Sequence, residues 1–189
     1  MLSIRLAKEE DYERILDIYR GAQEYMIRSG NPDQWGHRHP RADLVRKDIE
    51  EGISRVIYDE KGVHGVFALL EGADPTYAYI EGAWLNDDPY VTIHRIASDG
   101  TRRGLLDLAV AYARTFAPNV RVDTHAANLP MQRAIARCGF RPCGVIYIAD
   151  GSPRLAYQLP PPHKNNGRQM SAFFATPSSA QRVNAKGRR

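Results

Sequence analysis

One segment constrains the fold more than any other. A strand-like run from Tyr90 to Ala97 leads through a polar loop, Ser98 to Gly104, into a helix-like run that begins near Leu105. The first N–H groups of a helix have no partner inside it, and the helix dipole favours negative charge there. The glycines of the loop permit close backbone approach, and its arginines suit phosphate. The segment therefore predicts either an anion site or a plain strand-to-helix turn with solvated arginines.

Two phosphate-binding motifs are absent from this loop. A P-loop has four residues between its glycines and ends in Gly-Lys-Ser/Thr. Here three residues separate Gly100 from Gly104, and Leu105 follows. The Gly-x-Gly-x-x-Gly fingerprint of dinucleotide sites is also missing. ATP and NAD sites are thus disfavoured, and the diphosphate of another cofactor is the remaining candidate.

Hydrophobic spacing predicts an α/β chain with the order β-α-α-β-β-β-β-α-β-α-β-β. The three strand candidates between residues 54 and 82 are separated by turn-prone residues and predict an antiparallel meander. Asn128 is placed to cap the last helix, and Gly139 is placed to end it. The expected strands are 3–7, 54–59, 62–72, 76–82, 90–97, 119–124, 143–148 and 154–159, and the expected helices are 8–30, 42–52, 105–116 and 129–140.

Charge divides the chain into two parts. The net charge is +4, but residues 160–189 hold six basic side chains and no acidic one, so residues 1–159 are net −2. This composition predicts a domain over 1–159 and a disordered basic tail over 160–189. Nucleic acid is not the expected partner, because the tail lacks interleaved aromatic residues. A tail that binds nucleic acid stays as an alternative, and salt-dependent binding lost on truncation after Leu159 would identify it.

The cysteines and the apolar runs bear on metal sites and on the compartment. Cys138 and Cys143 are too few for a disulfide framework or a zinc site, so no metal is expected, and two small buried thiols fit a reducing cytosol. The N-terminus has no apolar segment of the signal-peptide kind. No run approaches the roughly 18 apolar residues of a membrane helix. We therefore expect a cytoplasmic protein without a membrane partner.

Two segments carry a resemblance to a known family. HRIASDGTRRG and the helix after it resemble the acyl-CoA diphosphate loop of the GNAT superfamily of N-acetyltransferases, and DTHAANLPMQRAIARCGF resembles its later motif, in which an Asn opens a helix that ends at Gly-Phe. The resemblance covers about residues 3–159, and several stretches are similar to one bacterial subgroup. It implies the GNAT acyl-CoA N-acyltransferase fold, a mixed and mostly antiparallel sheet with splayed parallel central strands flanked by helices.

The resemblance also implies a cofactor and its contacts. Acetyl-CoA would lie between the strands 90–97 and 119–124. Main-chain groups at 96–98 would pair with its pantetheine arm, and N–H groups at 100–105 would hold its diphosphate. The cofactor contacts expected on this basis are Ile96, Ala97, Ser98, Gly100, Thr101, Arg102, Arg103, Gly104, Leu105, Asn128 and Met131.

The sequence departs from the family pattern at two places. Leu105 and Leu106 stand where further small residues are usual, which shifts weight for diphosphate binding onto Arg102 and Arg103. Position 135 is Ile, where many relatives have a Tyr that protonates the leaving thiolate. The role of that acid is therefore vacant or filled by another group.

Four residues are candidates for the chemistry. His94 lies on the strand that enters the loop, and an ordinary pKa of about 6.5 suits a base near neutral pH; the alternative is a histidine paired with a carboxylate for structure. Asp123 and His125 lie on one face of their strand if it alternates regularly, so the two could act as a general base or polarise a water. The alternative is that one of them caps the strand. Tyr147 is a candidate for the missing acid, or else a core residue.

Three further residues are candidates for acceptor binding. Trp35 is either a wall of the acceptor site or an anchor of its loop, and Glu81 either faces the substrate or is solvated. Arg154 could reach a carboxylate or Asp123. The expected function is acetyl transfer from acetyl-CoA to the amine of a small molecule such as an amino acid or polyamine. The alternatives are a protein N-acetyltransferase and a non-catalytic acyl-CoA-binding module, and relatives of this kind are often homodimers.

Overall fold

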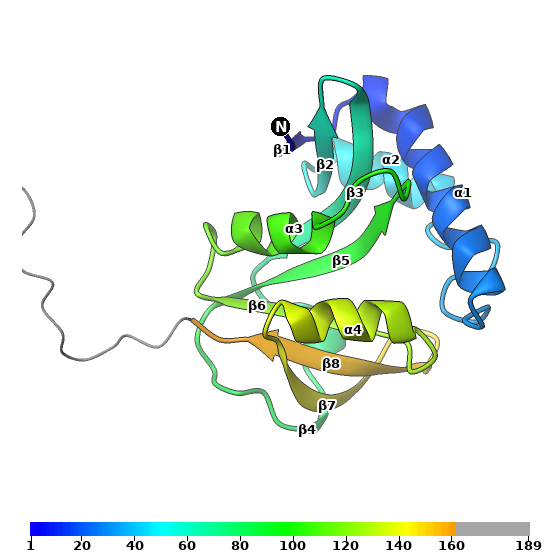
Figure 1. Cartoon of the computed structure of the whole chain (residues 1–189). Helices are drawn as coiled ribbons and strands as arrows, with labels where there is room; N and C mark the ends of the chain where they lie inside the picture. The colour runs from blue at the N-terminus through cyan, green and yellow to red at the C-terminus, as the bar shows by residue number, and fades with distance from the viewer. Residues whose placement is uncertain (162–189) are drawn as a thin grey trace, which may run out of the picture.

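A mixed sheet organises the part of the chain that the computed structural model describes, residues 1–161 (Figure 1). Its eight strands lie in the order β1-β2-β3-β5-β6-β8-β7-β4, and the pairs are antiparallel except β5 with β6. This confirms the mixed, mostly antiparallel sheet. The strands are β1 Ser3–Leu6, β2 Ser54–Asp59, β3 Gly62–Glu71, β4 Glu81–Gly82, β5 Tyr90–Ser98, β6 Asn119–Thr124, β7 Arg141–Tyr147 and β8 Pro153–Leu159.

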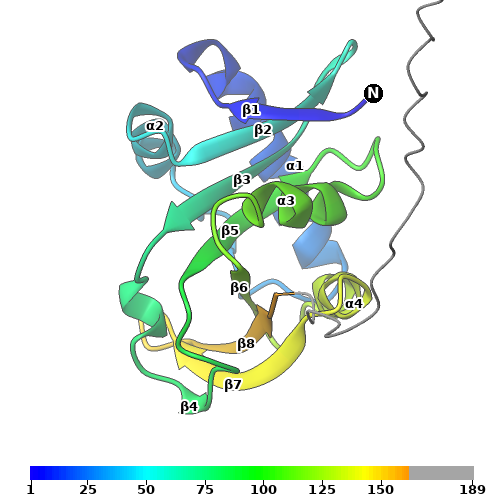
Figure 2. The same ribbon diagram turned by 90° about the vertical axis from the view of Figure 1, so that its left-hand side faces the viewer.

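Helices cover both faces of this sheet, and Figure 2 shows α3 in front of it and α1 behind it. Alternation along the strands explains why: Val56 of β2 packs in the cluster with α1 and α2, whereas Ile57 packs in the cluster with α3 and α4. The helices are α1 Tyr12–Arg28, α2 Ala42–Glu50, α3 Leu105–Ala113 and α4 Leu129–Arg137, with short 3₁₀ turns η1 Glu9–Asp11 and η2 Pro75–Tyr77.

The two parallel strands separate soon after they meet. β5 pairs with β6 only over Tyr90–Thr92 and Asn119–Arg121. Beyond Thr92, β5 stays on β3 while β6 continues along β8, so the strands diverge (Figure 1). The predicted splayed pair is therefore confirmed, and it opens the sheet at its centre.

The predicted three-strand meander is wrong in its third strand. Residues 54–59 and 62–71 form the expected hairpin, but β3 then pairs with β5. Asp74 accepts the main-chain N–H of Thr76 at 2.9 Å and caps η2, so residues 75–77 turn instead of extending. β4 is only two residues long and pairs with β7 at the far edge. Close packing there requires glycine, because a Cβ on Gly82 would lie 2.2 Å from the Cys143 carbonyl oxygen.

The last helix forms as its sequence predicts. The Asn128 side chain accepts the N–H of Met131 at 3.1 Å, and Gly139 after the helix has a φ of +84°. The predicted basic tail lies outside the described residues. Within residues 1–161 no helix is both long and apolar enough to cross a membrane.

Candidate active site

A cavity of about 760 Å³ lies where β5 and β6 separate. Its walls come from the loop after α1, the η2 turn, the second half of β5, the end of β6, the start of α4 and the turn before β8. The splayed strands therefore place side chains from six separate segments around one space. A cavity of this size is typical of small-molecule sites.

A bulge in β5 shapes one wall of the cavity. Ala68 of β3 lies opposite His94, but Val66 lies opposite Ala97, so β5 contains one extra residue between these pairs. Arg95 has a φ of +52°, a conformation that costs a non-glycine residue roughly 1–3 kcal/mol. As a result Ile96, and not Arg95, packs with Ile93 against the α3 cluster, while Arg95 reaches Asp48 of α2 at 2.7 Å. His94 and Arg95 both line the cavity, although they are consecutive.

His94 is held by a buried carboxylate. Its Nε2 lies 2.5 Å from Oδ2 of Asp74, whose side chain is 5% exposed. Burial opposes ionisation of Asp74, but hydrogen bonds from His94 and Thr76 outweigh it and lower the pKa of Asp74 to about 2. An ionised Asp74 must receive the proton on Nε2, so the other ring nitrogen, Nδ1, is the one left for chemistry.

Asp123 lies at that other nitrogen. Its Oδ1 is 3.5 Å from His94 Nδ1 and accepts the hydroxyl of Tyr77 at 2.8 Å. Tyr77 is buried, and burial together with the charge of Asp123 raises its pKa well above the usual 10. Tyr77 therefore stays protonated and donates to Asp123. The structure places His94 beside Asp123, two candidates that the sequence analysis named separately, and it adds two residues that sequence reasoning missed, Asp74 and Tyr77.

The sequence contains only a weak indication that Asp74 and Tyr77 belong to the site. Asp74 precedes Pro75 and Thr76, which is the pattern of a capped turn, and it was interpreted only as a turn. Tyr77 was assigned to a strand. Neither pattern shows that the turn folds back onto β5 and β6.

Five other predicted residues also line the cavity: Trp35, Ile96, Asn128, Met131 and Arg154. Trp35 does so while its ring packs edge-on against Tyr19 at 5.7 Å, so it is both loop anchor and wall. Asn128 and Met131, at the start of α4, line it too. The Asn128 amide also donates to Gln34 Oε1 at 2.9 Å, which ties α4 to the loop after α1.

Three predicted site residues lie elsewhere. His125 follows the end of β6, and its Nδ1 accepts the N–H of Ala127 at 3.2 Å, so the regular alternation that would pair it with Asp123 does not extend that far. Glu81 and Tyr147 contact each other at 2.8 Å on the exposed β4–β7 edge. None of the three lines the cavity, so the structure does not place Tyr147 where an acid is needed or Glu81 at the acceptor.

The loop before α3 has the form of an anion site. Gly100 and Gly104 have φ values of +78° and +74°, which favour glycine. In residues 1–161 no side chain caps the N-terminus of α3, so its first N–H groups keep their capacity to bind an anion. Two earlier N–H groups are already taken, since Gly100 donates to Ser98 Oγ and Thr101 to Asp99 Oδ1.

The two leucines that stand where small residues are usual in the family pattern pack in the hydrophobic core. Leu105 and Leu106 are 6% and 8% exposed and pack in the α3 cluster. A carboxylate, Asp107, also stands in the first turn of α3, where it disfavours a second negative charge. Diphosphate binding here would therefore depend on added positive charge.

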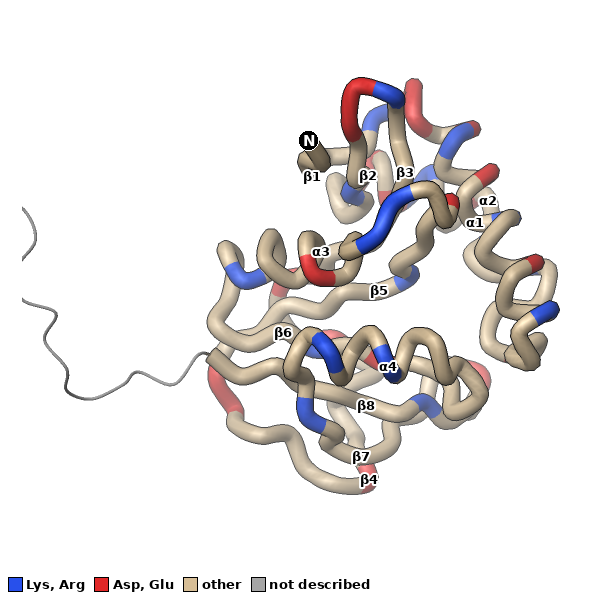
Figure 3. Tube along the Cα trace, in the orientation of Figure 1, with Lys and Arg blue, Asp and Glu red and all other residues tan. Residues whose placement is uncertain are grey.

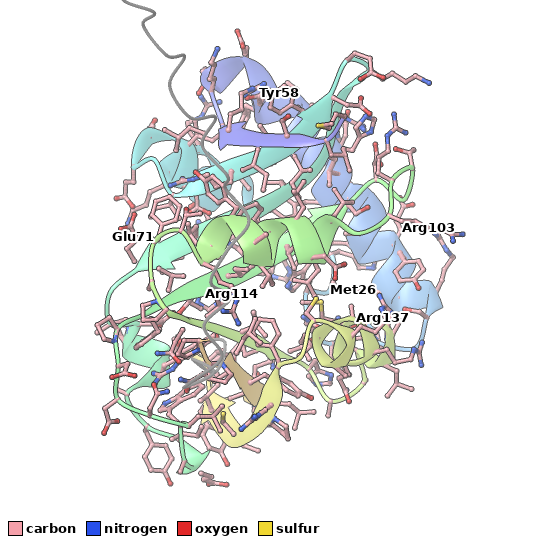
Figure 4. All side chains as sticks on the ribbon, turned by 60° about the vertical axis from the view of Figure 1, so that its left-hand side comes forward. Met26, Tyr58, Glu71, Arg103, Arg114 and Arg137 are labelled. Carbon is pink, nitrogen blue, oxygen red and sulfur yellow. The ribbon has the colours of Figure 1, made fainter. Side chains whose placement is uncertain are left out.

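The two loop arginines differ in what they contact. Arg102 is held by Asp59 at 2.8 Å, so it anchors the loop to β2. Arg103 is exposed and projects outward in Figure 4. Figure 3 shows basic positions in this loop and on α4, on the two sides of the diverging strands. Of the two arginines, Arg103 is the one with its charge available to a ligand.

The main chain of β5 offers a second set of contacts. Ala97 and Ser98 pair with β3 along one edge. On the other edge the partner strand has already diverged after Thr92. Main-chain groups at residues 96–98 on that edge are thus placed beside the cavity, where an extended ligand could add to the sheet.

Comparison with known proteins agrees with this geometry. A GNAT-family acetyltransferase from Streptococcus agalactiae 2603 superposes with a TM-score of 0.77 at 29% identity, over 86% of this chain and 96% of that one. The chain has the fold of the GNAT superfamily, and at 29% identity it also resembles this acetyltransferase in sequence. The GNAT fold is shared with a GNAT-family acetyltransferase from Listeria monocytogenes 4b F2365 (TM-score 0.63, 20% identity, 84% and 94% covered) and an N-acetyltransferase from Staphylococcus aureus Mu50 (0.56, 21%, 85% and 98%).

Two other comparisons of this chain found no match. No family model matches it, and no curated protein matches it. The likeness to GNAT acetyltransferases supports acyltransferase activity in general terms.

Proposed function

We propose that this protein transfers the acetyl group of acetyl-CoA to the amine of a small molecule. The observation that carries the proposal is the Asp74–His94 pair, which lies in the cavity at the splayed strands, beside the open edge of β5. A volume of about 760 Å³ favours a small acceptor over a folded protein surface.

Residues of this chain fit acetyl-CoA along the path described above. The α3 N-terminus and Arg103 would hold the diphosphate, and the main chain at 96–98 would hold the pantetheine arm. Bound in this way, acetyl-CoA supplies a thioester at the cavity. Thr124 lines the cavity, and its buried hydroxyl has no hydrogen-bond partner within residues 1–161, so it is the candidate donor to the thioester oxygen.

His94 would act as the general base. Asp74 keeps the proton on Nε2, so Nδ1 can accept a proton from the acceptor amine. An amine beside Nδ1 also reaches Asp123 Oδ1, because these two atoms are 3.5 Å apart. A carboxylate there attracts the ammonium form and orients it before the proton leaves.

The acetyl transfer itself needs few catalytic groups. The amine nitrogen attacks the thioester carbon, a C–N bond forms, and the C–S bond breaks with its electron pair on sulfur. His94 takes the proton that frees the lone pair of the ammonium nitrogen, and the second proton that the nitrogen loses as the amide forms passes to solvent. A thiol ionises readily, with a pKa near 8.5, so the thiolate can leave without an acid and take its proton from solvent. This suits a chain in which Ile135 is fully buried in the core and no acid stands at that position.

The test has two stages. Calorimetric titration with acetyl-CoA should show binding, and an amine panel with a thiol-release readout should show turnover that His94→Gln reduces by about 10²–10⁴-fold. Binding without turnover on any amine would favour the second candidate, a non-catalytic acyl-CoA-binding module, which the vacant position 135 supports. Absence of acetyl-CoA binding would overturn both.

A further inference from the structure

We propose that the acceptor carries a carboxylate in addition to its amine, and that Arg154 binds this carboxylate. This inference rests on the proposed function, since it describes the acceptor of the same site. It assigns Arg154 to acceptor specificity and narrows the acceptor class to amino acids and related amino carboxylates.

The first argument is that Arg154 is a buried cation without a protein anion. The residue is 6% exposed and lines the cavity. Its two hydrogen bonds go to main-chain carbonyl oxygens, those of Pro153 at 2.9 Å and Gln34 at 3.4 Å. Among residues 1–161 no carboxylate oxygen lies within 4 Å of it. A buried charge is costly unless it is paired, so this guanidinium lacks a partner that a ligand can supply.

Other cavity and core arginines show what pairing looks like in this protein. Arg95 lies 2.7 Å from Asp48. Arg121, equally buried, lies between the rings of Trp84 and Tyr90, at 3.9 and 3.8 Å from their centres. Arg154 has neither kind of neighbour, although a guanidinium presents five N–H donors in a fork that matches a carboxylate.

The carboxylates near Arg154, those of Asp150 and Asp123, accept hydrogen bonds from other residues. Asp150 lines the cavity, but it accepts the N–H of Ser152 at 2.8 Å and its hydroxyl, and these bonds, with a smaller contribution from the charge of Arg154, lower the pKa of Asp150. Asp123 accepts from Tyr77. The suggestion that Arg154 reaches Asp123 is therefore not what the structure shows.

The second argument is the spacing between Arg154 and the catalytic groups. Asp123 lies opposite Ala156 in the β6–β8 pair, and Arg154 is two residues before Ala156, so both side chains leave the same face. Such diagonal neighbours have Cβ atoms about 7–8 Å apart. The short carboxylate of Asp123 and the longer side chain of Arg154 both line the cavity, and this span leaves room for an amine and a carboxylate separated by only a few bonds.

The third argument is the division of charge within the cavity. Asp74 and Asp123 lie at the end where the amine would react. Arg154, the arginine without a carboxylate partner, lies toward His39, whose pKa is lowered by burial and then by the charges of Arg95 and Arg154. The amine of an amino carboxylate would lie at the acidic end of the cavity and its carboxylate at the arginine end. A polyamine would place a second positive charge near the arginine, where it is repelled.

The experiment compares matched acceptors. Each of the twenty amino acids is offered with acetyl-CoA, alongside its carboxamide, in which the carboxylate is replaced by a neutral group of similar size. For the wild type we expect kcat/KM to favour the carboxylate by about 10–100-fold, the usual range for a charge-assisted hydrogen-bonded pair. In Arg154→Gln this ratio should fall to within a few fold of one, and Arg154→Lys should restore part of it.

Arg46→Gln is the matched control, because Arg46 is an exposed arginine of α2 paired with Glu9 and does not line the cavity. Its ratio should equal that of the wild type. Carboxamides used as well as carboxylates by the wild type would overturn the inference and leave the proposed function intact. No transfer to either set would overturn the inference, and the proposed function would fall with it only if the wider amine panel is also inactive while acetyl-CoA still binds. The wild-type comparison decides the matter even if Arg154→Gln fails to fold.

Discussion

Two carboxylates beside one imidazole define what His94 can do. Asp74 is the better buried of the two and receives hydrogen bonds from His94 and from both donors of Thr76. Asp123 is shared with Tyr77. The first carboxylate fixes the tautomer of the ring, and the second lies where the amine would bind. These positions give the two acids different roles in the same reaction.

Asp74→Asn should separate these roles. An amide can donate to Nε2, which favours the wrong tautomer of His94 and takes away the lone pair on Nδ1. We expect kcat to fall by about 10²–10⁴-fold with acetyl-CoA affinity unchanged. Tyr77→Phe, which leaves the ring of His94 in its tautomer, should cost much less. Equal losses in the two variants, measured by thiol release, would show that Asp74 does not act by orienting His94.

The two arginines of the loop between β5 and α3 have different contacts. Arg102 neutralises Asp59, a side chain 7% exposed that also contacts His64 at 2.8 Å. Arg103 is exposed. One residue shapes the loop, and its neighbour is available to the ligand.

Alanine variants of the two arginines should therefore behave differently. Arg103→Ala should weaken acetyl-CoA binding by about 3–10-fold without a change in the free energy of unfolding, as for one exposed charge on phosphate. Arg102→Ala should also lower that free energy, because Asp59 loses the guanidinium that contacts it at 2.8 Å. Calorimetry and urea titration measure the two quantities. A stability loss in Arg103→Ala, or none in Arg102→Ala, would contradict this division.

The elements that sequence analysis found are those with local signals. The Tyr90–Ala113 segment and α4 carry helical periodicity, glycines and caps within a few residues of one another. The prediction of a strand at 76–82 is wrong because the aromatic residues at alternate positions there belong to the η2 turn and the segment after it, with Tyr77 buried and Tyr79 exposed. Alternation alone does not distinguish these cases.

The site could be predicted only in part, for a related reason. His94 was found through its place beside the loop. Its partners Asp74 and Asp123 are 20 and 29 positions away, and the bulge that turns Arg95 into the cavity leaves no mark in the composition of β5. Such features depend on how three segments meet, which the spacing of a single segment does not contain.

The molecule as a whole should lose stability in acid. Folding lowers the pKa of several carboxyl groups: Asp11 through its hydrogen bond with Arg5, and Asp59, Asp74 and Asp99 because hydrogen bonds and nearby cations outweigh burial. A carboxyl with a lowered pKa stabilises the fold above its unfolded value of about 3.9, and this contribution is lost as the pH falls toward the folded value. Asp48, with a pKa raised by burial against the opposing charge of Arg95, acts in the other direction.

Urea titrations at pH 6 and pH 3 test this expectation. The midpoint should be clearly lower at pH 3, since the carboxyl groups with a lowered pKa outnumber the one with a raised pKa. Asp59→Asn should show a smaller difference between the two pH values, because it removes the carboxyl whose pKa is lowered furthest among these four. A wild-type midpoint that is the same at both pH values would refute the prediction.

The extra residue in β5 also acts as a spacer. Bulged strands bend and twist more strongly, so the bulge at Arg95 turns β5 away from β6 just beyond their last pair. Removing Arg95 altogether would let Phe67 face Ile96 in a regular ladder and let the gap between the strands narrow. Arg95→Gly, by contrast, keeps the residue count and suits a φ of +52°. We expect acetyl-CoA binding to survive Arg95→Gly and to be lost in the deletion, so the width of the opening is set by the number of residues in one strand and not by their identity.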